Sequence, residues 1–268
     1  MTVDASYPPT LLDEADLAAL SDRLTRFGRV RYSVSVDSTN ARALESLHAY
    51  DALGISFVTE SQEAGRGRAG RSWHSSVAAG LLCSTILPAE VPNAVLPAVG
   101  FWASLAARSA IRAICSVETR LKWPNDLMLD ERKCAGILCE ARSAGASSRV
   151  VVGIGINVNR PAGVHDDLEN IAAWLSDATK CDVNRTSLLN ALLCEYERSF
   201  DALMSDPEAI IAKWAEAAAL DGQRVNVKGP DGSPLHAGTV LGIARNGALL
   251  LRTDAGDVRV TLGDVSAA

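Results

Sequence analysis

Hydrophobic and polar positions along the chain predict a mixture of helices and strands. Apolar residues at helical spacing predict helices over residues 11–27, 40–50, 93–114, 186–204 and 207–220. Alternating or continuous apolar runs predict strands over residues 30–36, 55–60, 80–87, 120–123, 135–141 and 150–159. Ser38 stands where the N-cap of the second helix is expected, because its hydroxyl can accept a bond from a backbone N–H.

The pattern changes after residue 220. Short apolar segments separated by glycines predict a small all-β unit over residues 221–268. We therefore predict an α/β (α+β) protein with two domains, 1–220 and 221–268. The apolar runs are too short to cross a bilayer, and the N-terminal sequence lacks the basic start of a signal peptide. A cytoplasmic protein without a membrane partner is expected.

Composition narrows the classes of protein. The 268 residues are 48% hydrophobic and carry a net charge of -6, which indicates a folded core and no nucleic-acid partner. The six cysteines and four histidines have no metal-ligand spacing, so reduced thiols and no protein-held metal ion are expected.

The sequence GRGRAGRSW, residues 65–73, is the most specific segment. Its glycines let the backbone approach a ligand, and its arginines, Arg66, Arg68 and Arg71, are fork-shaped donors for phosphate or carboxylate. A solvated linker and a short nucleic-acid contact remain alternatives. Trp73 argues against a simple linker because a large aromatic side chain packs on a surface. Anion binding is the favoured interpretation.

Two segments in the middle of the chain carry further candidates. Lys122 begins the sequence KWPND at the end of an expected strand, where Asn125 and Asp126 could hold a nucleotide or only stabilise a turn. Lys133 starts the next expected strand and could be an ordinary solvated strand end.

Two other segments add polar groups and glycines. The sequence GIGIN, residues 153–157, lies within an apolar strand and lacks the third glycine of a dinucleotide loop, so its glycines indicate a close approach of a ligand or backbone. The Ser38-Thr39-Asn40 segment could be only a helix cap or could bind a ligand. The chain has no GxxxxGK[ST], HExxH or GxSxG sequence.

Taken together and in this order, these segments resemble the biotin protein ligases. The resemblance covers most of the chain from about Val34 onward. It implies a catalytic domain related to class II aminoacyl-tRNA synthetases, with a mixed sheet flanked by helices, followed by an SH3-like β-barrel. Only 36 residues precede Asp37, fewer than a DNA-binding winged helix needs, so the monofunctional form is expected.

The resemblance also implies a site for biotin, ATP and Mg²⁺ bound to ATP. Lys133, Arg68 and Arg66 are the implied catalytic residues. The implied biotin contacts are Ser38, Thr39, Asn40, Gln62, Gly65, Arg66, Gly67, Arg68, Lys133, Gly136, Gly153 and Gly155. The implied contacts to ATP or the adenylate are Arg66, Arg68, Arg71, Trp73, Lys122, Asn125, Asp126, Lys133 and Asn157.

The implied activity is formation of biotinyl-5′-AMP and transfer of biotin to a lysine of a biotin carboxyl carrier protein of acyl-CoA carboxylase. A monomer or weak homodimer is expected. A lipoate or octanoate ligase is the nearest alternative, and a non-catalytic biotin-binding module is the alternative from another class. The loop at residues 62–76 is expected to become ordered over the adenylate.

Overall fold

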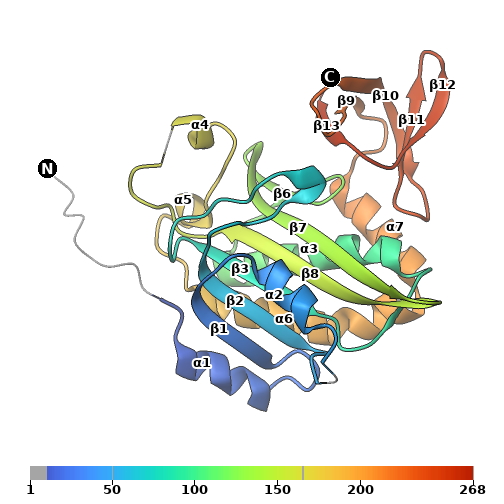
Figure 1. Cartoon of the computed structure of the whole chain (residues 1–268). Coiled ribbons are helices and arrows are strands. Elements are labelled where there is room, and N and C mark those ends of the chain that lie inside the picture. Colours follow the sequence, from blue (N-terminus) through green and yellow to red (C-terminus); the bar gives the residue numbers. More distant parts are fainter. Residues whose placement is uncertain (1–10, 50, 165, 268) are drawn as a thin grey trace, which may run out of the picture.

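The fold is built on one large mixed sheet, in a computed structural model that describes residues 11–49, 51–164 and 166–267 (Figure 1). Its strands are β1 (Arg29–Val36), β2 (Ile55–Gln62), β3 (Gly80–Ile86), β4 (Val91–Pro92), β5 (Arg120–Lys122), β6 (Asp126–Leu129), β7 (Arg132–Ala144) and β8 (Ser147–Asn157). The order across the sheet is β1-β2-β3-β8-β7-β6-β5, and β4 pairs with β8. The strands β1 and β2 are parallel, whereas the other pairs are antiparallel.

Helices flank this sheet, which confirms the predicted fold class. They are α1 (Glu14–Ala18), α2 (Thr39–Ser46), α3 (Leu96–Cys115), α4 (Asp166–Glu169), α5 (Leu175–Thr179), α6 (Arg185–Ser205) and α7 (Pro207–Ala218), with short 3-10 turns η1 (Ala19–Asp22) and η2 (Arg68–Gly70). The long helices α3, α6 and α7 lie on one side of the sheet, and α2 lies on the other (Figure 1).

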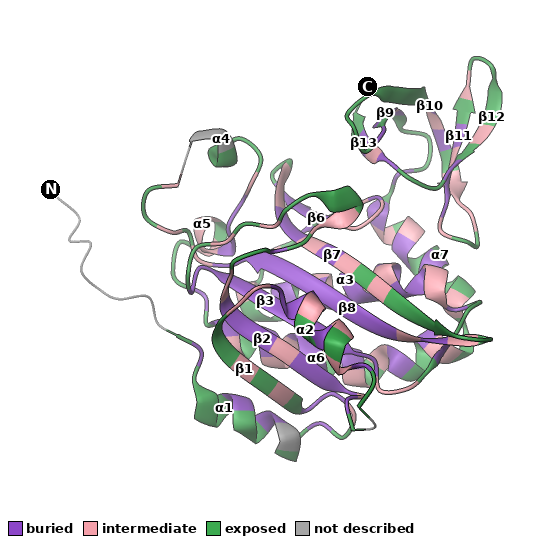
Figure 2. Cartoon of the chain, in the orientation of Figure 1, coloured by how far each residue is buried: buried purple, intermediate pink, exposed green. Residues whose placement is uncertain are grey.

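The helical side of the sheet holds the main core. Trp102 of α3 stacks on Tyr196 of α6 with ring centroids 4.5 Å apart, and Phe27 packs against both rings. The indole N–H of Trp214 in α7 donates to the Ser104 hydroxyl at 2.8 Å. Since β3 and β8 are buried along almost their whole length, they form the rigid centre of the sheet (Figure 2).

The first predicted helix is wrong in length. Residues 11–27 form only α1 and η1. The backbone N–H groups of Arg26 and Phe27 donate to the Glu197 carboxylate at 2.9 and 3.2 Å instead of continuing a helical ladder. Tertiary contacts therefore override the helical periodicity, and they direct Phe27 into the aromatic core.

Other predicted elements match with shifted bounds. Ser38 is the N-cap of α2 and accepts the Ala41 N–H, as expected. That helix ends at Ser46, and residue 50, its expected end, lies outside the described residues. The strand β7 is longer than predicted, and the helices α4 and α5 were not predicted.

A second, antiparallel sheet ends the chain. Its strands are β9 (Arg224–Lys228), β10 (Pro234–Ile243), β11 (Leu249–Thr253), β12 (Gly256–Val260) and β13 (Asp264–Ala267), in the order β12-β11-β10-β9-β13. It lies beside α7 and the β5–β6 end of the large sheet (Figure 1). Within the part of the chain that the structure describes, no helix has the length and apolar character needed to span a bilayer.

Candidate active site

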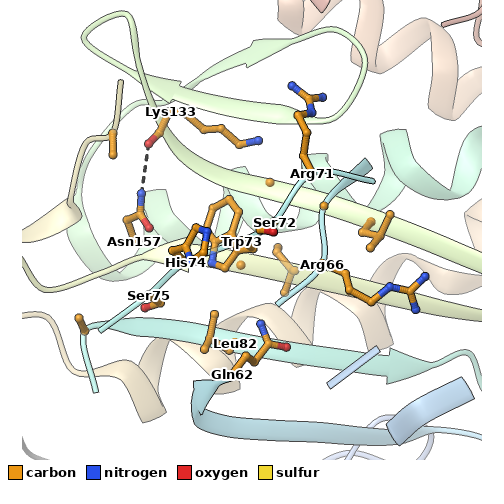
Figure 3. Close-up of a pocket in the computed structure, with 18 of the residues that line it drawn as sticks. Gln62, Arg66, Arg71, Ser72, Trp73, His74, Ser75, Leu82, Lys133 and Asn157 are labelled. Atoms are coloured by element: carbon orange, nitrogen blue, oxygen red, sulfur yellow. Dashed lines mark hydrogen bonds between the residues drawn. The ribbon is translucent and has the colours of Figure 1, made fainter. Parts of the chain in front are cut away.

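A pocket of about 660 Å³ opens on the α2 side of the large sheet. It is surrounded by the loop at residues 65–73, here called the arginine-rich loop, by the start of α2, by strands β7 and β8, and by residues 161–164 and 168–174. Figure 3 shows side chains that line it. The sheet brings these segments together because β3, from an earlier part of the sequence, pairs with β8, and β8 pairs with the preceding strand β7.

Most of the residues selected from sequence lie around this one pocket. They are Ser38, Thr39, Asn40, Gln62, Arg66, Gly67, Arg68, Arg71, Trp73, Asn125, Lys133, Gly136, Gly153, Gly155 and Asn157. Gly65, Lys122 and Asp126 are not in the lining. Gly65 lies behind Trp73, whose backbone N–H donates to the Gly65 carbonyl at 2.9 Å. Lys122 on β5 lies opposite Asp126 on β6 in the backbone register of the sheet.

A buried polar cluster forms one end of the pocket. The backbone N–H and hydroxyl of Thr39 lie 2.8 and 3.0 Å from the Gln62 side-chain oxygen. The Ser84 hydroxyl lies 2.7 Å from Thr39 Oγ1 and 2.5 Å from Asn40 Oδ1. Since Ser84 is fully buried and Thr39 and Asn40 nearly so, these polar groups are held in place for a polar ligand.

Glycines form the floor next to this cluster. Gly136 of β7 and Gly155 of β8 are directly paired, and the Trp73 indole lies over both. A Cβ on Gly155 would lie 2.5 Å from Trp73 Cε2, and one on Gly153 would lie 2.0 Å from Asn40 Oδ1. These positions therefore need glycine because side chains pack on the backbone itself.

Lys133 is the cation nearest the floor. Its ammonium nitrogen is 2.6 Å from Asp126 Oδ1 and 5.4 Å from the centre of the Trp73 ring. The contact with Asp126 is an ion pair without hydrogen-bond alignment. The buried Trp73 indole N–H has no hydrogen-bond partner among the described residues.

The turn of the KWPND sequence positions a second cation. The Asn125 side chain donates to the Ile137 carbonyl at 2.8 Å and accepts from Arg68 Nη1 at 3.1 Å. Burial lowers the pKa of the Arg68 guanidinium. A cation that is partly withdrawn from water attracts an anionic ligand more strongly than an exposed one.

Arg66 and Arg71 do not point toward Lys133. Arg66 turns its guanidinium away from the pocket centre, and Arg71 extends in another direction (Figure 3). The Glu140 carboxylate accepts from Arg66 at 2.9 Å, whereas Asp264 of β13 accepts from Arg71 at 2.7 Å. Both arginines are thus neutralised by carboxylates in this structure.

Sequence reasoning missed one wall and two polar residues of the site. The wall includes Val164, Leu168, Ile171 and Trp174. Its end pairs with the start of β7, where Lys133 N–H donates to the Ile171 carbonyl at 2.8 Å. Ser84 and Glu140 were also missed. Their positions carry no signal in the sequence, because only the fold brings them to the pocket.

Comparisons with known proteins agree with this architecture. Residues 32–157 match the model of the Biotin/lipoate A/B protein ligase family, and residues 222–267 match the Biotin protein ligase C terminal domain. The fold and the site thus define a biotin or lipoate type of ligase.

Individual relatives narrow this class. The Bifunctional ligase/repressor BirA of Bacillus spizizenii is 31% identical over 92% of this chain and 78% of its own. The Biotin--[acetyl-CoA-carboxylase] ligase of Mycobacterium tuberculosis is 32% identical over 85% of each chain. The biotin protein ligase from Aquifex aeolicus, solved in complex with biotin and ATP, is 27% identical, with a TM-score of 0.72 over 90% of this chain and 98% of that one. This chain belongs to the biotin protein ligase family.

Proposed function

We propose that this chain activates biotin with ATP and transfers it to a lysine of a biotin carboxyl carrier protein of an acyl-CoA carboxylase. The observation that carries the proposal is one pocket with buried polar groups at one end and the cations Lys133 and Arg68 beside its glycine floor. Support comes from relatives named biotin--[acetyl-CoA-carboxylase] ligase and from a similar structure in complex with biotin and ATP.

Biotin fits the pocket with its ureido head at the polar end. A ureido group has both N–H donors and a carbonyl acceptor, which match Thr39, Gln62 and their neighbours. The valerate tail would cross the floor of Gly136 and Gly155 under Trp73, and its carboxylate would reach Lys133. A lipoyl dithiolane could not satisfy these buried polar groups, which disfavours the lipoate alternative.

The first chemical step joins two anions. A biotin carboxylate oxygen attacks the α-phosphorus of ATP, the bond to the bridging oxygen breaks, and pyrophosphate leaves with the electron pair. Lys133 and Arg68 stabilise the charge on the reacting phosphate. Asn125 keeps Arg68 in position. Arg66 would assist only after releasing Glu140.

Mg²⁺ enters with ATP as part of the substrate. Among the described residues no group of three or more His, Cys, Asp or Glu side chains could hold a metal ion. Mg²⁺ that is bound to the phosphates of ATP keeps several waters and needs only one or two protein ligands. When present, the ion neutralises the triphosphate and the leaving pyrophosphate.

The nucleotide lies next to the tail of biotin in this proposal. Asn157, whose amide donates to the Lys133 carbonyl at 3.2 Å, and Asn125 supply polar contacts. The apolar side chains of Ile171 and Trp174 supply a surface for the adenine ring. Lys122 stays a weaker candidate, since it does not line the pocket.

In the second step the acceptor lysine attacks the acyl carbon of the mixed anhydride, and AMP leaves. The amine must lose a proton before or during this attack. We assign this role to Asp126, which pairs with Gly136 on the neighbouring strand, because movement of Lys133 toward phosphate would free the Asp126 carboxylate beside the floor of the pocket.

Two further expectations remain proposals. We place a domain boundary near Leu220, where the chain leaves α7 and enters the C-terminal sheet. We also propose a monomer or a weak homodimer, which sedimentation of the purified chain at several concentrations would distinguish.

Exchange of labelled pyrophosphate into ATP tests the proposed function. The purified chain with Mg²⁺ is given biotin, lipoate or octanoate, and each acid is then tested for transfer to a biotin carrier domain. Exchange and transfer with biotin alone support the proposal. Exchange with lipoate would reassign the chain to that class, and no exchange with any acid, even with the carrier added, would favour a non-catalytic binding module.

A further inference from the structure

Glu140 of β7 connects two parts of the pocket wall without lining the pocket itself. Its carboxylate accepts from Asn40 Nδ2 and from Arg66 Nη2, each at 2.9 Å. Its side chain is 22% exposed, so these bonds are partly shielded from water. Glu140 therefore ties the start of α2 to the arginine-rich loop.

Glu140 fixes the orientation of the Asn40 amide. Asn40 Nδ2 donates to Glu140 and lies 3.3 Å from the Leu138 carbonyl. A flipped amide would place Asn40 Oδ1 against these two acceptors, which is unfavourable in a buried site. Asn40 Oδ1 therefore faces Ser84 Oγ, only 2.5 Å away.

This orientation decides where the hydroxyl protons lie. Ser84 Oγ is 2.5 Å from Asn40 Oδ1 and 2.7 Å from Thr39 Oγ1, but it has one proton for the two contacts. Asn40 Oδ1 can only accept, so the Ser84 proton goes to Asn40. The proton for the contact between Ser84 and Thr39 must then come from Thr39.

The remaining lone pairs of Thr39 are therefore available to a ligand. Ser84 and Thr39 have two hydroxyl protons for three contacts, and the contact between Thr39 Oγ1 and the Gln62 oxygen is the longest of the three at 3.0 Å. We therefore leave that contact without a proton, since the Gln62 oxygen also accepts the Thr39 backbone N–H at 2.8 Å. With its proton directed to Ser84, Thr39 Oγ1 acts as an acceptor in the pocket.

We propose that Glu140 is a positioning residue for biotin, which acts through Asn40 and Ser84 to present Thr39 Oγ1 as an acceptor to a ureido N–H. This inference rests on the proposed function. A ureido head has N–H donors for this acceptor, whereas a dithiolane has none. Glu140 thereby contributes to selection of the acid, although it does not touch it.

The test is a double-mutant cycle on the full chain, with the dissociation constant of biotin measured by calorimetry. Glu140→Met removes the acceptor for Asn40, and Thr39→Val removes the final acceptor. Each is expected to weaken biotin binding by about 3- to 10-fold, the value of one neutral hydrogen bond. The double variant is expected to bind biotin no worse than Thr39→Val alone, because both changes interrupt the same series of hydrogen bonds.

Ser84→Ala repeats the test without breaking an ion pair. Ser84 is the middle residue of the hydrogen-bond series from Glu140 to Thr39. Loss of its hydroxyl is expected to weaken biotin binding to the same extent and to combine non-additively with Thr39→Val. The KM for ATP of Ser84→Ala is expected to stay within about twofold, since the hydroxyl contacts only the polar end of the pocket. If Glu140→Met does not fold, the cycle of Ser84→Ala with Thr39→Val tests the proposed series of hydrogen bonds instead.

Glu90→Met is the matched control, because Glu90 also accepts from a hydroxyl and pairs with an arginine, but outside the pocket. It is expected to bind biotin as the unmodified chain does. Biotin binding that is unchanged in Ser84→Ala, or effects that multiply in the double variants, would overturn this inference. Failure of the unmodified chain to bind biotin would instead overturn the proposed function.

Discussion

Arg71 and Asp264, 193 residues apart in the chain, form a two-pronged ion pair. Arg71 Nη1 is 2.7 Å from Asp264 Oδ2, and Nη2 is 3.3 Å from Oδ1. A second contact lies nearby, where the Trp123 indole N–H donates to the Gly247 carbonyl at 3.0 Å. The C-terminal sheet therefore contacts both the arginine-rich loop and the KWPND turn, two of the segments that build the pocket.

Asp264→Asn is expected to loosen the loop while leaving the fold nearly as stable. The Arg71 and Asp264 side chains are 50% and 32% exposed, so water weakens the pair and it contributes at most about 1 kcal/mol. Loss of the tether should nevertheless expose the loop, whose arginines are trypsin sites. Limited trypsin digestion without ligand should show faster cleavage after Arg66, Arg68 or Arg71.

Asp257→Asn provides the control for that digestion. Asp257 pairs with Arg252 on the same sheet, 3.1 Å apart, and both are well exposed. Its removal should leave cleavage of the loop unchanged. Equal rates in Asp264→Asn and the unmodified chain would show that the ion pair does not restrain the loop.

Lys133→Ala should keep the fold and lose most adenylation. The ammonium group is the cation nearest the glycine floor, and removal of one preorganised charge from a reacting centre typically costs about 100- to 1000-fold in rate. Pyrophosphate exchange with biotin measures the loss. Lys213→Ala, on the exposed side of α7, is the control and should retain full exchange. Full exchange in Lys133→Ala would remove this residue from the site.

Gly155→Ala should displace Trp73 from the floor. The added methyl group would lie 2.5 Å from Trp73 Cε2, and such overpacking costs about 1–3 kcal/mol. Urea unfolding should show this loss together with weaker biotin binding. At Gly100, inside α3, the nearest atom to a new Cβ is 3.9 Å away, so Gly100→Ala should stabilise the fold by about 0.5–1 kcal/mol. Normal biotin binding by Gly155→Ala would contradict the assignment of the floor.

The sequence was sufficient to find the segments of the site because their chemistry is local. Glycines act through their own backbone, arginines through their charged side chains and the Ser38 cap through its hydroxyl, so a short sequence pattern is enough to mark each of them. The contacts between segments could not be found this way. The pairing of Glu140 with Asn40 and Arg66 depends on the neighbouring positions of β7 and α2, which only the fold creates.

The errors in predicted elements have the same cause. Residues 11–27 have helical periodicity, but Glu197, far away in sequence, binds the backbone of Arg26 and Phe27. The pocket wall at residues 161–164 and 168–174 has neither strong periodicity nor a motif, and its end is held by pairing of Ala172 with Lys133 at the start of β7. Residues that are distant in the sequence determine the conformation of both segments, and a local sequence pattern carries no information about such contacts.

Glu60→Gln should strongly destabilise the chain without changing a residue of the pocket. Glu60 is fully buried and lies 2.5 Å from Arg185, and it also accepts from Leu12 N–H and the Tyr32 hydroxyl at 2.6 and 2.8 Å. Glu60→Gln removes the buried negative charge that pairs with Arg185, and loss of one partner of a buried ion pair costs about 3–5 kcal/mol. Urea unfolding measures the change, with Glu208→Gln as the control, because Glu208 is 55% exposed in its ion pair with Arg245. A decrease of less than about 1 kcal/mol in the free energy of unfolding would show that the Glu60–Arg185 pair does not stabilise the fold.

Binding of biotin and ATP should protect the loop at residues 62–76 from trypsin. The loop carries Arg66 and Arg71, whose carboxylate partners are on other segments, and anionic phosphates would compete with those partners for the guanidinium groups. Closure over the adenylate would also exclude water from the mixed anhydride. Digestion with neither substrate, with each alone and with both identifies the species that orders the loop. Protection should be greatest with both, and it should require Lys133 because Lys133→Ala forms little adenylate. Equal cleavage under all four conditions would mean that the loop does not close over the intermediate.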